Sequence, residues 1–326
     1  MRIQVIGAGG WGIALTRLLA LKGHNVSISC RAEDHPEVLR ETRQNPRLLP
    51  GILLPENAEV TSHVDPEVDV AVFAVPSHAM RAVAAAHPLS PRTIRVSVAK
   101  GVENETLLRM SQVIAEISGP RPVVALSGPT HAEEVGRGLP ASIVAASVDA
   151  EAAWKVQDIF MTETFRVYTS PDMLGVELGG ALKNVIAIAA GVCDGMGLGD
   201  NAKAALITRG LAEIARLGVA MGANPLTFAG LSGLGDLVVT CASRHSRNRA
   251  VGERIAQGET LEAIQGSSPM IAEGVRNAQS AHGLARRQRV DMPIAEQVYR
   301  VLFEGANPRE AVAALLARDA KPELYV

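Results

Sequence analysis

Residues 3–12 read Ile-Gln-Val-Ile-Gly-Ala-Gly-Gly-Trp-Gly, an apolar run of strand length that passes directly into a G-x-G-x-x-G motif. A helical stretch over residues 13–21 follows the motif. In this context Gly7 permits a tight turn, Gly9 lets the backbone approach a pyrophosphate, and Gly12 lets the helix pack on the strand. The helix N-terminus offers free N–H groups to the phosphates. The stretch therefore predicts a dinucleotide-binding strand–helix unit, and a purely structural turn is the alternative.

Further apolar runs of strand length follow in the first half, separated by segments long enough for helices. They cover residues 26–30, 70–75, 94–98, 123–127 and 142–147. Runs that are apolar on both faces are typical of a parallel sheet covered by helices on both sides. We therefore expect an α/β fold that begins with a doubly wound, Rossmann-type parallel sheet.

The strand pattern stops near residue 170, and the rest of the chain has helical periodicity. Ser170-Pro171 is typical of an N-cap followed by proline at the first helical position, and predicts a long helix through Cys193. Further helices are expected over about 200–222, 248–256, 275–287, 294–303 and 308–316. We expect an NAD(P)-binding domain over residues 1–174 and an all-α substrate-binding domain over residues 175–326.

The composition narrows the class of protein. The chain has 326 residues, of which 47% are hydrophobic and 20% charged, as expected for two ordinary globular domains. Its net charge of −2 and its 3% of aromatic residues argue against a nucleic-acid partner. Three cysteines without C-x-x-C spacing favour neither a disulfide framework nor a zinc site, and no metal is expected. The cysteine pattern favours a reducing, cytoplasmic location. No signal peptide is expected, because the apolar run after Met1-Arg2 is too short and too rich in glycine, and no membrane span is expected, because the longest uncharged run, residues 217–235, contains a proline and five glycines.

Arg31 bears on the choice of cofactor. NAD-specific sites usually place an acidic residue at the end of the second strand, where it binds the ribose 2′-hydroxyl. Arg31 stands there instead, and a guanidinium suits the 2′-phosphate of NADP. Glu33 and Asp34 follow closely and remain candidates for a free hydroxyl. We expect NADP with tolerance of NAD, with a solvated surface arginine as the alternative.

Two further candidates follow later strands, at the sheet edge where open α/β sheets bind their ligands. Lys100 precedes a glycine and is placed to meet an anionic ligand, although a surface lysine is the alternative. Thr130 and Glu133 have the spacing of a capping box, so Thr130 is either a helix cap or a ligand-binding residue.

Lys183 is the candidate for acid–base chemistry. Its helical neighbours at three and four positions are glycine, alanine and isoleucine, so its own helix offers no counter-charge. Burial among such groups lowers the pKa of a lysine towards neutrality, where it exchanges protons. The alternative is a lysine whose ammonium reaches water. Asp236 ends a second glycine-rich loop, where it either orients Lys183 or caps the next helix.

A phosphate site is expected where Ser246, Arg247 and Asn248 begin a helix. Ser246 is a candidate N-cap. A helix N-terminus that carries an arginine, a hydroxyl and an amide suits a phosphate by charge and by donor count. A charged, solvated turn is the alternative.

Over nearly its whole length the chain resembles the bacterial NAD(P)-dependent glycerol-3-phosphate dehydrogenases. The similarity rests on the glycine motif with Trp11 and on residues 49–55, 74–77, 99–101, 126–130, 182–184, 233–236, 246–249 and 273–274. Ile13 and Thr130 depart from the family, which usually has threonine and serine there. Neither departure removes a required functional group.

The resemblance implies reversible reduction of dihydroxyacetone phosphate to sn-glycerol 3-phosphate, which supplies phospholipid synthesis. It implies that Lys183 is the general acid/base. The implied substrate residues are Lys100, Gly128, Thr130, Lys183, Asp236, Ser246, Arg247 and Asn248. The implied cofactor residues, added to Gly7, Gly9 and Gly12 of the motif, are Gly10, Trp11, Arg31, Lys100, Ala132, Arg247 and Glu273.

Two other functions remain open. The same two-domain plan serves dehydrogenases of 2-hydroxy and 3-hydroxy acids, which act on a carboxylate instead of a phosphate. A non-catalytic NADP-binding sensor would need the glycine motif but neither Lys183 nor the Ser246–Asn248 cluster, and both are present. The oligomeric state is left open, with a homodimer as the candidate.

Overall fold

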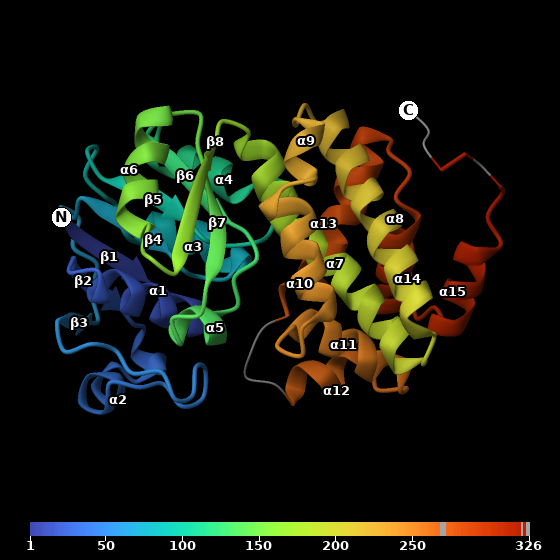
Figure 1. The fold of residues 1–326 in the computed structure, drawn as a ribbon, viewed down its shortest axis with the longest axis horizontal. Coiled ribbons are helices and arrows are strands. Elements are labelled where there is room, and N and C mark those ends of the chain that lie inside the picture. Colours follow the sequence, from blue (N-terminus) through green and yellow to red (C-terminus); the bar gives the residue numbers. More distant parts are fainter. Residues whose placement is uncertain (268–271, 321, 324–326) are drawn as a thin grey trace.

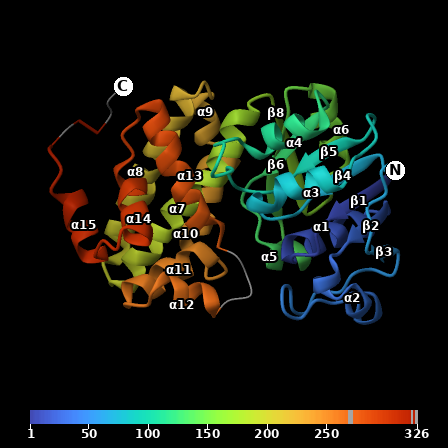
Figure 2. The same cartoon turned by 180° about the vertical axis from the view of Figure 1, so that it is seen from behind.

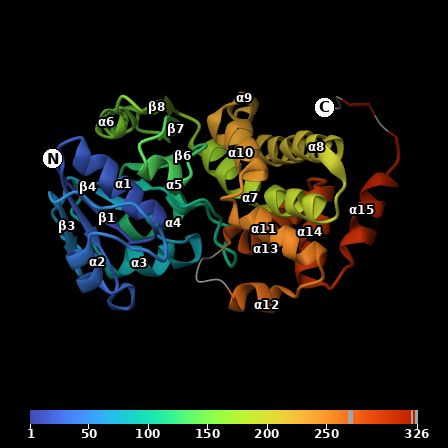
Figure 3. The same ribbon diagram turned by 60° about the horizontal axis from the view of Figure 1, so that its bottom comes forward.

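The computed structural model describes residues 1–267, 272–320 and 322–323. A sheet flanked by helices forms the first half of the chain, and the described residues from 172 onward form helices and no strand (Figure 1). We refer to these as the sheet half and the helical half. Seen from behind and from below, the two halves lie side by side, with α7 (Met173–Gly195) beginning near their junction (Figures 2 and 3).

One eight-stranded sheet organises the sheet half, in the order β3-β2-β1-β4-β5-β6-β7-β8. Its strands are β1 (Arg2–Ile6), β2 (Asn25–Ser29), β3 (Ala58–Thr61), β4 (Val70–Phe73), β5 (Ile94–Ser97), β6 (Val123–Ser127), β7 (Ala141–Ala146) and β8 (Phe165–Ser170). Its helices are α1 (Gly10–Leu21), α2 (Pro36–Thr42), α3 (Met80–Ala86), α4 (Met110–Ser118), α5 (Ala132–Gly136) and α6 (Ala150–Phe160). Buried apolar clusters lie on both faces of the sheet, as a doubly wound fold requires. The expected α/β fold class is confirmed.

The sheet departs from the expectation in one pairing, because β6 and β7 are antiparallel. The only helix between them is α5, which has five residues. Five helical residues rise about 8 Å, whereas a five-residue strand spans about 17 Å, so α5 is too short to return the chain along the sheet. The chain therefore turns back at the same end and starts β7 in the opposite direction.

Two strands, β3 and β8, were not expected from the sequence. Their burial alternates along the chain, with Glu59, Arg166 and Tyr168 exposed between buried neighbours. Both strands lie at the edges of the sheet, where one face meets solvent, so neither gives a continuous apolar run.

The helical half is built around α7, most of whose residues are buried. The helices after it are α8 (Gly199–Ala220), α9 (Pro225–Phe228), α10 (Asp236–Ala242), α11 (Arg247–Ala256), α12 (Leu261–Gly266), α13 (Glu273–Gln288), α14 (Pro293–Phe303) and α15 (Pro308–Leu316). One π-helical turn, Leu231–Gly235, precedes α10. The expected all-helical C-terminal part is confirmed, and it has an apolar core of its own.

The expected cap of the long helix was wrong by two residues. Ser170 ends β8, and Asp172 is the N-cap, with its carboxylate accepting a hydrogen bond of 2.9 Å from the Gly175 N–H. Aspartate and serine cap equally well, so local sequence alone did not distinguish them.

Two helical stretches, Met173–Gly195 and Pro225–Ala242, are long and apolar enough to cross a membrane by length and composition. In the first stretch, 94% of the apolar segment is buried inside the protein. That burial is typical of a core helix, in agreement with the central place of α7.

Helices α7 and α11 cross at backbone distance. A Cβ at Gly191 of α7 would overlap the Arg249 carbonyl, and a Cβ at Gly252 of α11 would overlap the Ile188 carbonyl. Glycine is required at both positions because each backbone occupies the space of the other's missing side chain. This crossing holds the N-terminal end of α11 against the helix that carries Lys183.

Candidate active site

Lys183 lies in a buried ion cluster near the carboxyl edge of the sheet. Its side chain and that of Asp236 are 6% and 1% exposed. The Lys183 ammonium donates to Asp236 Oδ1 and, at 2.6 Å, to the Thr240 hydroxyl. The alternative in which this lysine reaches water is wrong. Asp236 comes from α10, so the counter-charge that α7 lacks is supplied by another helix.

Lys100 binds the second oxygen of the same carboxylate. It follows β5, and its Nζ donates to Asp236 Oδ2 and to the Gly128 carbonyl, both at 2.8 Å. Its side chain is 18% exposed, so it faces the site instead of the open surface. Asp236 is itself the first residue of α10, whose N-cap is Gly235, so of its two expected roles it orients Lys183.

Burial lowers the pKa of Lys183 to about 7. The Asp236 carboxylate opposes this effect, whereas the positive charge of Lys100 reinforces it. A lysine with a pKa near 7 exists in both protonation states at neutral pH, as an acid/base catalyst must.

A chain of amides connects the cluster to the start of α11. Asn184 donates to the Lys100 carbonyl at 3.3 Å and accepts from the Asn248 amide at 2.9 Å. Asn248 in turn accepts from the Gly274 N–H at 2.8 Å. Asn248, which is expected to bind substrate, is therefore connected through the single side chain of Asn184 to the backbone of Lys100 and to the residue that follows Lys183.

Ser246 and Arg247 begin α11. The Ser246 hydroxyl accepts from the Arg249 N–H at 3.2 Å, which confirms Ser246 as the N-cap. The Arg249 guanidinium is held by Asp194 of α7. Arg247 is exposed, and its side chain forms no hydrogen bond or ion pair with any described residue. Its guanidinium is therefore available to a ligand.

The glycine motif lies as expected between β1 and α1. Gly7 has a φ of 111°, and a Cβ at Gly12 would overlap the Gly7 carbonyl. Gly9 is the N-cap of α1, and, apart from Gly9 and its two chain neighbours, no heavy atom of the described chain lies within 4 Å of where its Cβ would stand. Open space above Gly9 at a helix N-terminus suits a pyrophosphate. Gly10 lies close to Ala132, since a Cβ there would be 3.8 Å from that of Ala132.

Arg31 follows β2, and its side chain is 74% exposed. Its guanidinium pairs with both oxygens of Asp34, at 3.0 and 3.1 Å. Asp34, which was a candidate for the ribose hydroxyl, is thus engaged by the arginine. Glu33 is farther away, at 3.8 Å.

Thr130 is not a helix cap. The N-cap of α5 is His131, which forms no side-chain cap. The Thr130 hydroxyl instead donates to the Gly128 carbonyl at 3.1 Å, the same oxygen that Lys100 binds. The expected capping box fails because α5 begins one residue later than the spacing implied.

Glu273 joins the two halves of the chain at the start of α13. Its carboxylate accepts from the Ser77 N–H at 3.1 Å and from the Ser77 hydroxyl at 2.5 Å. Ser77 follows β4, so this contact also lies at the carboxyl edge of the sheet. Trp11, another expected cofactor residue, is half-buried and packs against the main core of the sheet half.

Three residues at the cluster were not expected from the sequence. The Thr240 hydroxyl accepts a hydrogen bond from Lys183, the Asn277 amide donates to the Lys100 carbonyl, and His131 lies near both lysines. Burial and the Lys183 charge lower the pKa of His131, whose Nε2 is buried and has no partner among the described residues. Only Thr240 carries a sequence signal, since it stands one helical turn after Asp236.

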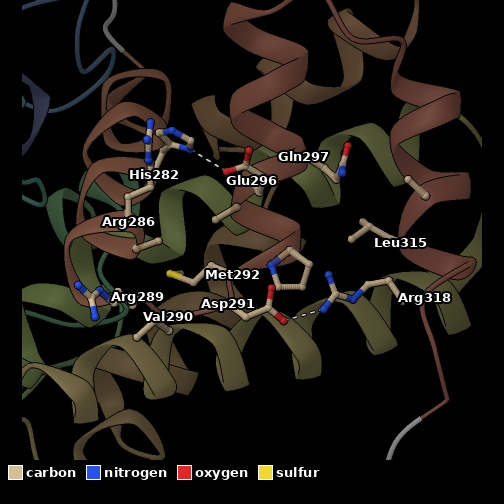
Figure 4. Close-up of a pocket in the computed structure, with 14 residues that line it drawn as sticks. His282, Arg286, Arg289, Val290, Asp291, Met292, Glu296, Gln297, Leu315 and Arg318 are labelled. Carbon is tan, nitrogen blue, oxygen red and sulfur yellow. Dashed lines mark hydrogen bonds and ion pairs between the residues drawn. The ribbon is translucent and has the colours of Figure 1, made fainter.

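A separate cavity of about 420 Å³ lies among α13, α14 and α15 (Figure 4). Its lining includes the ion pair of Arg318 with Asp291, at 2.6 Å, and the bond from His282 to Glu296, at 2.7 Å. None of its lining residues belongs to the expected site.

The fold and the cluster define a class of protein. A dinucleotide-binding sheet half, followed by a helical half with a buried lysine of near-neutral pKa, describes an oxidoreductase of the two-domain dehydrogenase type.

Comparison with known proteins makes the assignment specific. Residues 2–153 match the family of the NAD-dependent glycerol-3-phosphate dehydrogenase N-terminus, and residues 172–313 match that of its C-terminus. The chain is 52% identical to glycerol-3-phosphate dehydrogenase [NAD(P)+] of Pelotomaculum thermopropionicum, covering 99% of this chain and 95% of that one. The same-named protein of Fusobacterium nucleatum is 51% identical, with 99% of each chain covered. The crystal structure of glycerol-3-phosphate dehydrogenase from Coxiella burnetii superposes with a TM-score of 0.93 at 36% identity, covering 97% of this chain and 99% of that chain.

The chain belongs to the NAD-dependent glycerol-3-phosphate dehydrogenase family. This confirms the resemblance and the expected class of enzyme and cofactor.

Proposed function

We propose that this NAD(P)-dependent glycerol-3-phosphate dehydrogenase reversibly reduces dihydroxyacetone phosphate to sn-glycerol 3-phosphate, for phospholipid synthesis, with Lys183 as general acid/base. The observation that carries the proposal is the buried Lys183–Asp236–Lys100 cluster. It puts a lysine of near-neutral pKa beside a second cation at the sheet edge where ligands of this fold bind.

The nicotinamide dinucleotide, when bound, supplies the hydride. As negative charge develops on the substrate carbonyl oxygen, protonated Lys183 donates its Nζ proton and leaves a hydroxyl group. In the reverse direction the neutral amine of Lys183 accepts the hydroxyl proton. Asp236 and Thr240 hold Nζ in place through both states by accepting its other hydrogen bonds. Lys100 adds a positive charge that stabilises the developing oxyanion.

The substrate phosphate would bind at the start of α11. Arg247 supplies a guanidinium that no described residue binds, and Ser246 and Asn248 belong to the same helix N-terminus. Thr130 and Gly128 lie on the Lys100 side of the cluster. A substrate that extends from Lys183 to α11 would therefore contact residues from both halves of the chain.

The dinucleotide would bind with its pyrophosphate over Gly9, at the N-terminus of α1. Gly10 and Trp11 follow Gly9 as the first residues of α1, Ala132 lies beside Gly10, and Arg31 would bind the 2′-phosphate of NADP. Glu273 would approach from the helical half. The open space above Gly9 supports this placement.

We propose residues 1–174 as the dinucleotide-binding domain and residues 175–326 as the substrate-binding domain, since each half has its own apolar core. A cytoplasmic location is supported by three buried, free thiols, those of Cys30, Cys193 and Cys241. A homodimer is the candidate assembly.

The test is oxidation of NADPH, followed by absorbance, when dihydroxyacetone phosphate is added, and then with NADH in its place. Oxidation of 3-hydroxyisobutyrate by NADP is measured in parallel. Turnover of the phosphate substrate alone supports the proposal, whereas turnover of the carboxylate alone identifies a hydroxyacid dehydrogenase. Binding of NADPH without turnover of either identifies a sensor.

A further inference from the structure

Asn277 is a buried amide on α13 that lies between the two lysine-bearing segments. It is 1% exposed. Its Nδ2 donates to the Lys100 carbonyl and to the Ala181 carbonyl, both at 3.0 Å. Lys100 follows β5 in the sheet half, and Ala181 stands two residues before Lys183 in α7. One side chain thus links the backbones of both segments.

The orientation of this amide is fixed by its surroundings. Two carbonyl oxygens face Nδ2, so a rotation that exchanged Nδ2 and Oδ1 would place three acceptors against one another. Oδ1 is buried and has no partner within the described chain. A Cβ at Gly101 would lie 3.1 Å from that oxygen, so the Lys100–Gly101 backbone packs closely against Asn277.

We propose that Asn277 is a positioning residue that holds Lys100 at the place where it and Lys183 bind one carboxylate. The proposal rests on the proposed function, because it gives the geometry of the two lysines a role in turnover. Asn184 also donates to the Lys100 carbonyl, at the longer distance of 3.3 Å. Asn184 Nδ2 donates in addition to the Gly180 carbonyl of its own helix, at 3.4 Å, whereas Asn277 bonds both segments from a third element, α13, and at the shorter distance of 3.0 Å.

The proposal predicts a change in the titration of Lys183. The charged and titratable groups that act on it are Asp236 and Cys241 of α10, Lys100 after β5, and His131 before α5. If the loss of Asn277 lets the Lys100 ammonium move away from Asp236, its positive charge no longer opposes protonation of Lys183. The Asp236 carboxylate then binds Lys183 alone. Both changes raise the pKa of Lys183.

The variant Asn277→Leu keeps the approximate shape of the side chain and removes both donors. Gln279→Ala is the matched control, because Gln279 lies on the same helix and also binds the sheet half, but it is exposed and its partner is Asn104, at 2.7 Å, and not Lys100. We expect kcat/KM for dihydroxyacetone phosphate to fall about tenfold or more in Asn277→Leu, since two buried hydrogen bonds are lost. We also expect the alkaline limb of kcat for reduction to move to higher pH. The control should change neither.

A double-mutant cycle separates positioning from simple loss of packing. Once Lys100 is replaced in Lys100→Met, adding Asn277→Leu should lower kcat/KM little further. An equal loss in both backgrounds, or a lowered Tm with an unmoved pH profile, would show that Asn277 only clamps the two halves together. Should Asn277→Leu not fold, Asn277→Ser, which keeps one donor, is put through the same measurements. Failure of the wild type to reduce dihydroxyacetone phosphate would instead overturn the proposed function, whatever Asn277 does.

Discussion

Lys183 and Lys100 bind opposite oxygens of one carboxylate, that of Asp236. Two cations therefore share a single buried anion, and the cluster keeps an excess positive charge when both lysines are protonated. Burial lowers the pKa of Lys183, the more deeply buried of the two lysines, to about 7, and the positive charge of Lys100 acts in the same direction. The same excess favours an anionic substrate.

Replacing Lys183 should remove the proton donor without removing the cofactor site. A positioned general acid contributes about 10²–10⁴-fold to rate, so we expect kcat to fall at least about 100-fold in Lys183→Met and in Lys183→Arg. Arginine keeps the charge but does not titrate near neutral pH. Binding of NADPH, followed by its fluorescence, should stay near that of the wild type. Retention of more than about a tenth of wild-type kcat would contradict the assignment.

Lys100 is the rival for the same role, and exogenous amines distinguish the two. Small amines should restore kcat to Lys183→Met in proportion to their basicity, because they replace a proton donor. They should not restore Lys100→Met, in which a binding and positioning group is missing. Rescue confined to Lys100→Met would reverse the two roles.

Arg31 should discriminate between the two dinucleotides. A charge-assisted hydrogen bond is worth about 1.5–3 kcal/mol, so Arg31→Ala should raise the KM for NADPH roughly 10- to 150-fold. NADH lacks the 2′-phosphate and serves as the internal control. The Asp34 carboxylate, released from its partner, should further disfavour the phosphate. Equal effects on both cofactors would show that Arg31 is only a surface residue.

Arg247 should act on the substrate phosphate. We expect Arg247→Ala to lower kcat/KM for dihydroxyacetone phosphate and to leave the slow turnover of unphosphorylated dihydroxyacetone nearly unchanged. Arg244→Ala is the control, because that arginine is also exposed but precedes the N-cap. NADPH affinity is measured in each variant. An equal loss on both substrates with intact cofactor binding would exclude the phosphate role.

Glu213 should make the stability of the helical half depend on pH. Its buried carboxylate accepts from the Ile294 and Ala295 N–H groups, at 2.8 and 3.2 Å, and burial raises its pKa to about 7. The folded state thus holds the proton more tightly than the unfolded state, whose glutamate has a pKa near 4.3. The resulting stabilisation is complete below that value and is lost as pH rises towards 7.

The variant Glu213→Gln removes this titration and keeps a side-chain oxygen near the start of α14. Between about pH 4.3 and 7, the free energy of unfolding of the wild type should fall relative to the variant by about 3 kcal/mol. Denaturant titrations at several pH values measure the difference. A constant difference across this range would mean that the glutamate titrates normally.

Much of the site could be predicted from residues that are close together in the sequence. These predict the glycine motif, the apolar neighbours of Lys183 on its own helix and the N-cap at Ser246. What was missed depends on contacts between segments distant in the chain. Asp236 had two equally good local roles, and only the packing of α10 on α7 distinguishes them. Asn277 has no sequence signal at all, since its partners are backbone carbonyls of segments nearly 100 residues or more away. The antiparallel direction of β7 and the pairing of the edge strand β8 likewise depend on how the strands are ordered in the sheet, which local sequence does not determine.

The glycine crossing of α7 and α11 has a consequence for the length of the substrate. Lys183 lies on one helix and Ser246 caps the other, so the crossing fixes the distance between the two helix segments that carry the proposed proton donor and the proposed phosphate site. The crossing therefore limits the number of carbons that fit between the carbonyl and the phosphate of the substrate. We therefore expect a ketone with a longer chain between carbonyl and phosphate to be a poorer substrate, because the two helices cannot move apart without losing their contact.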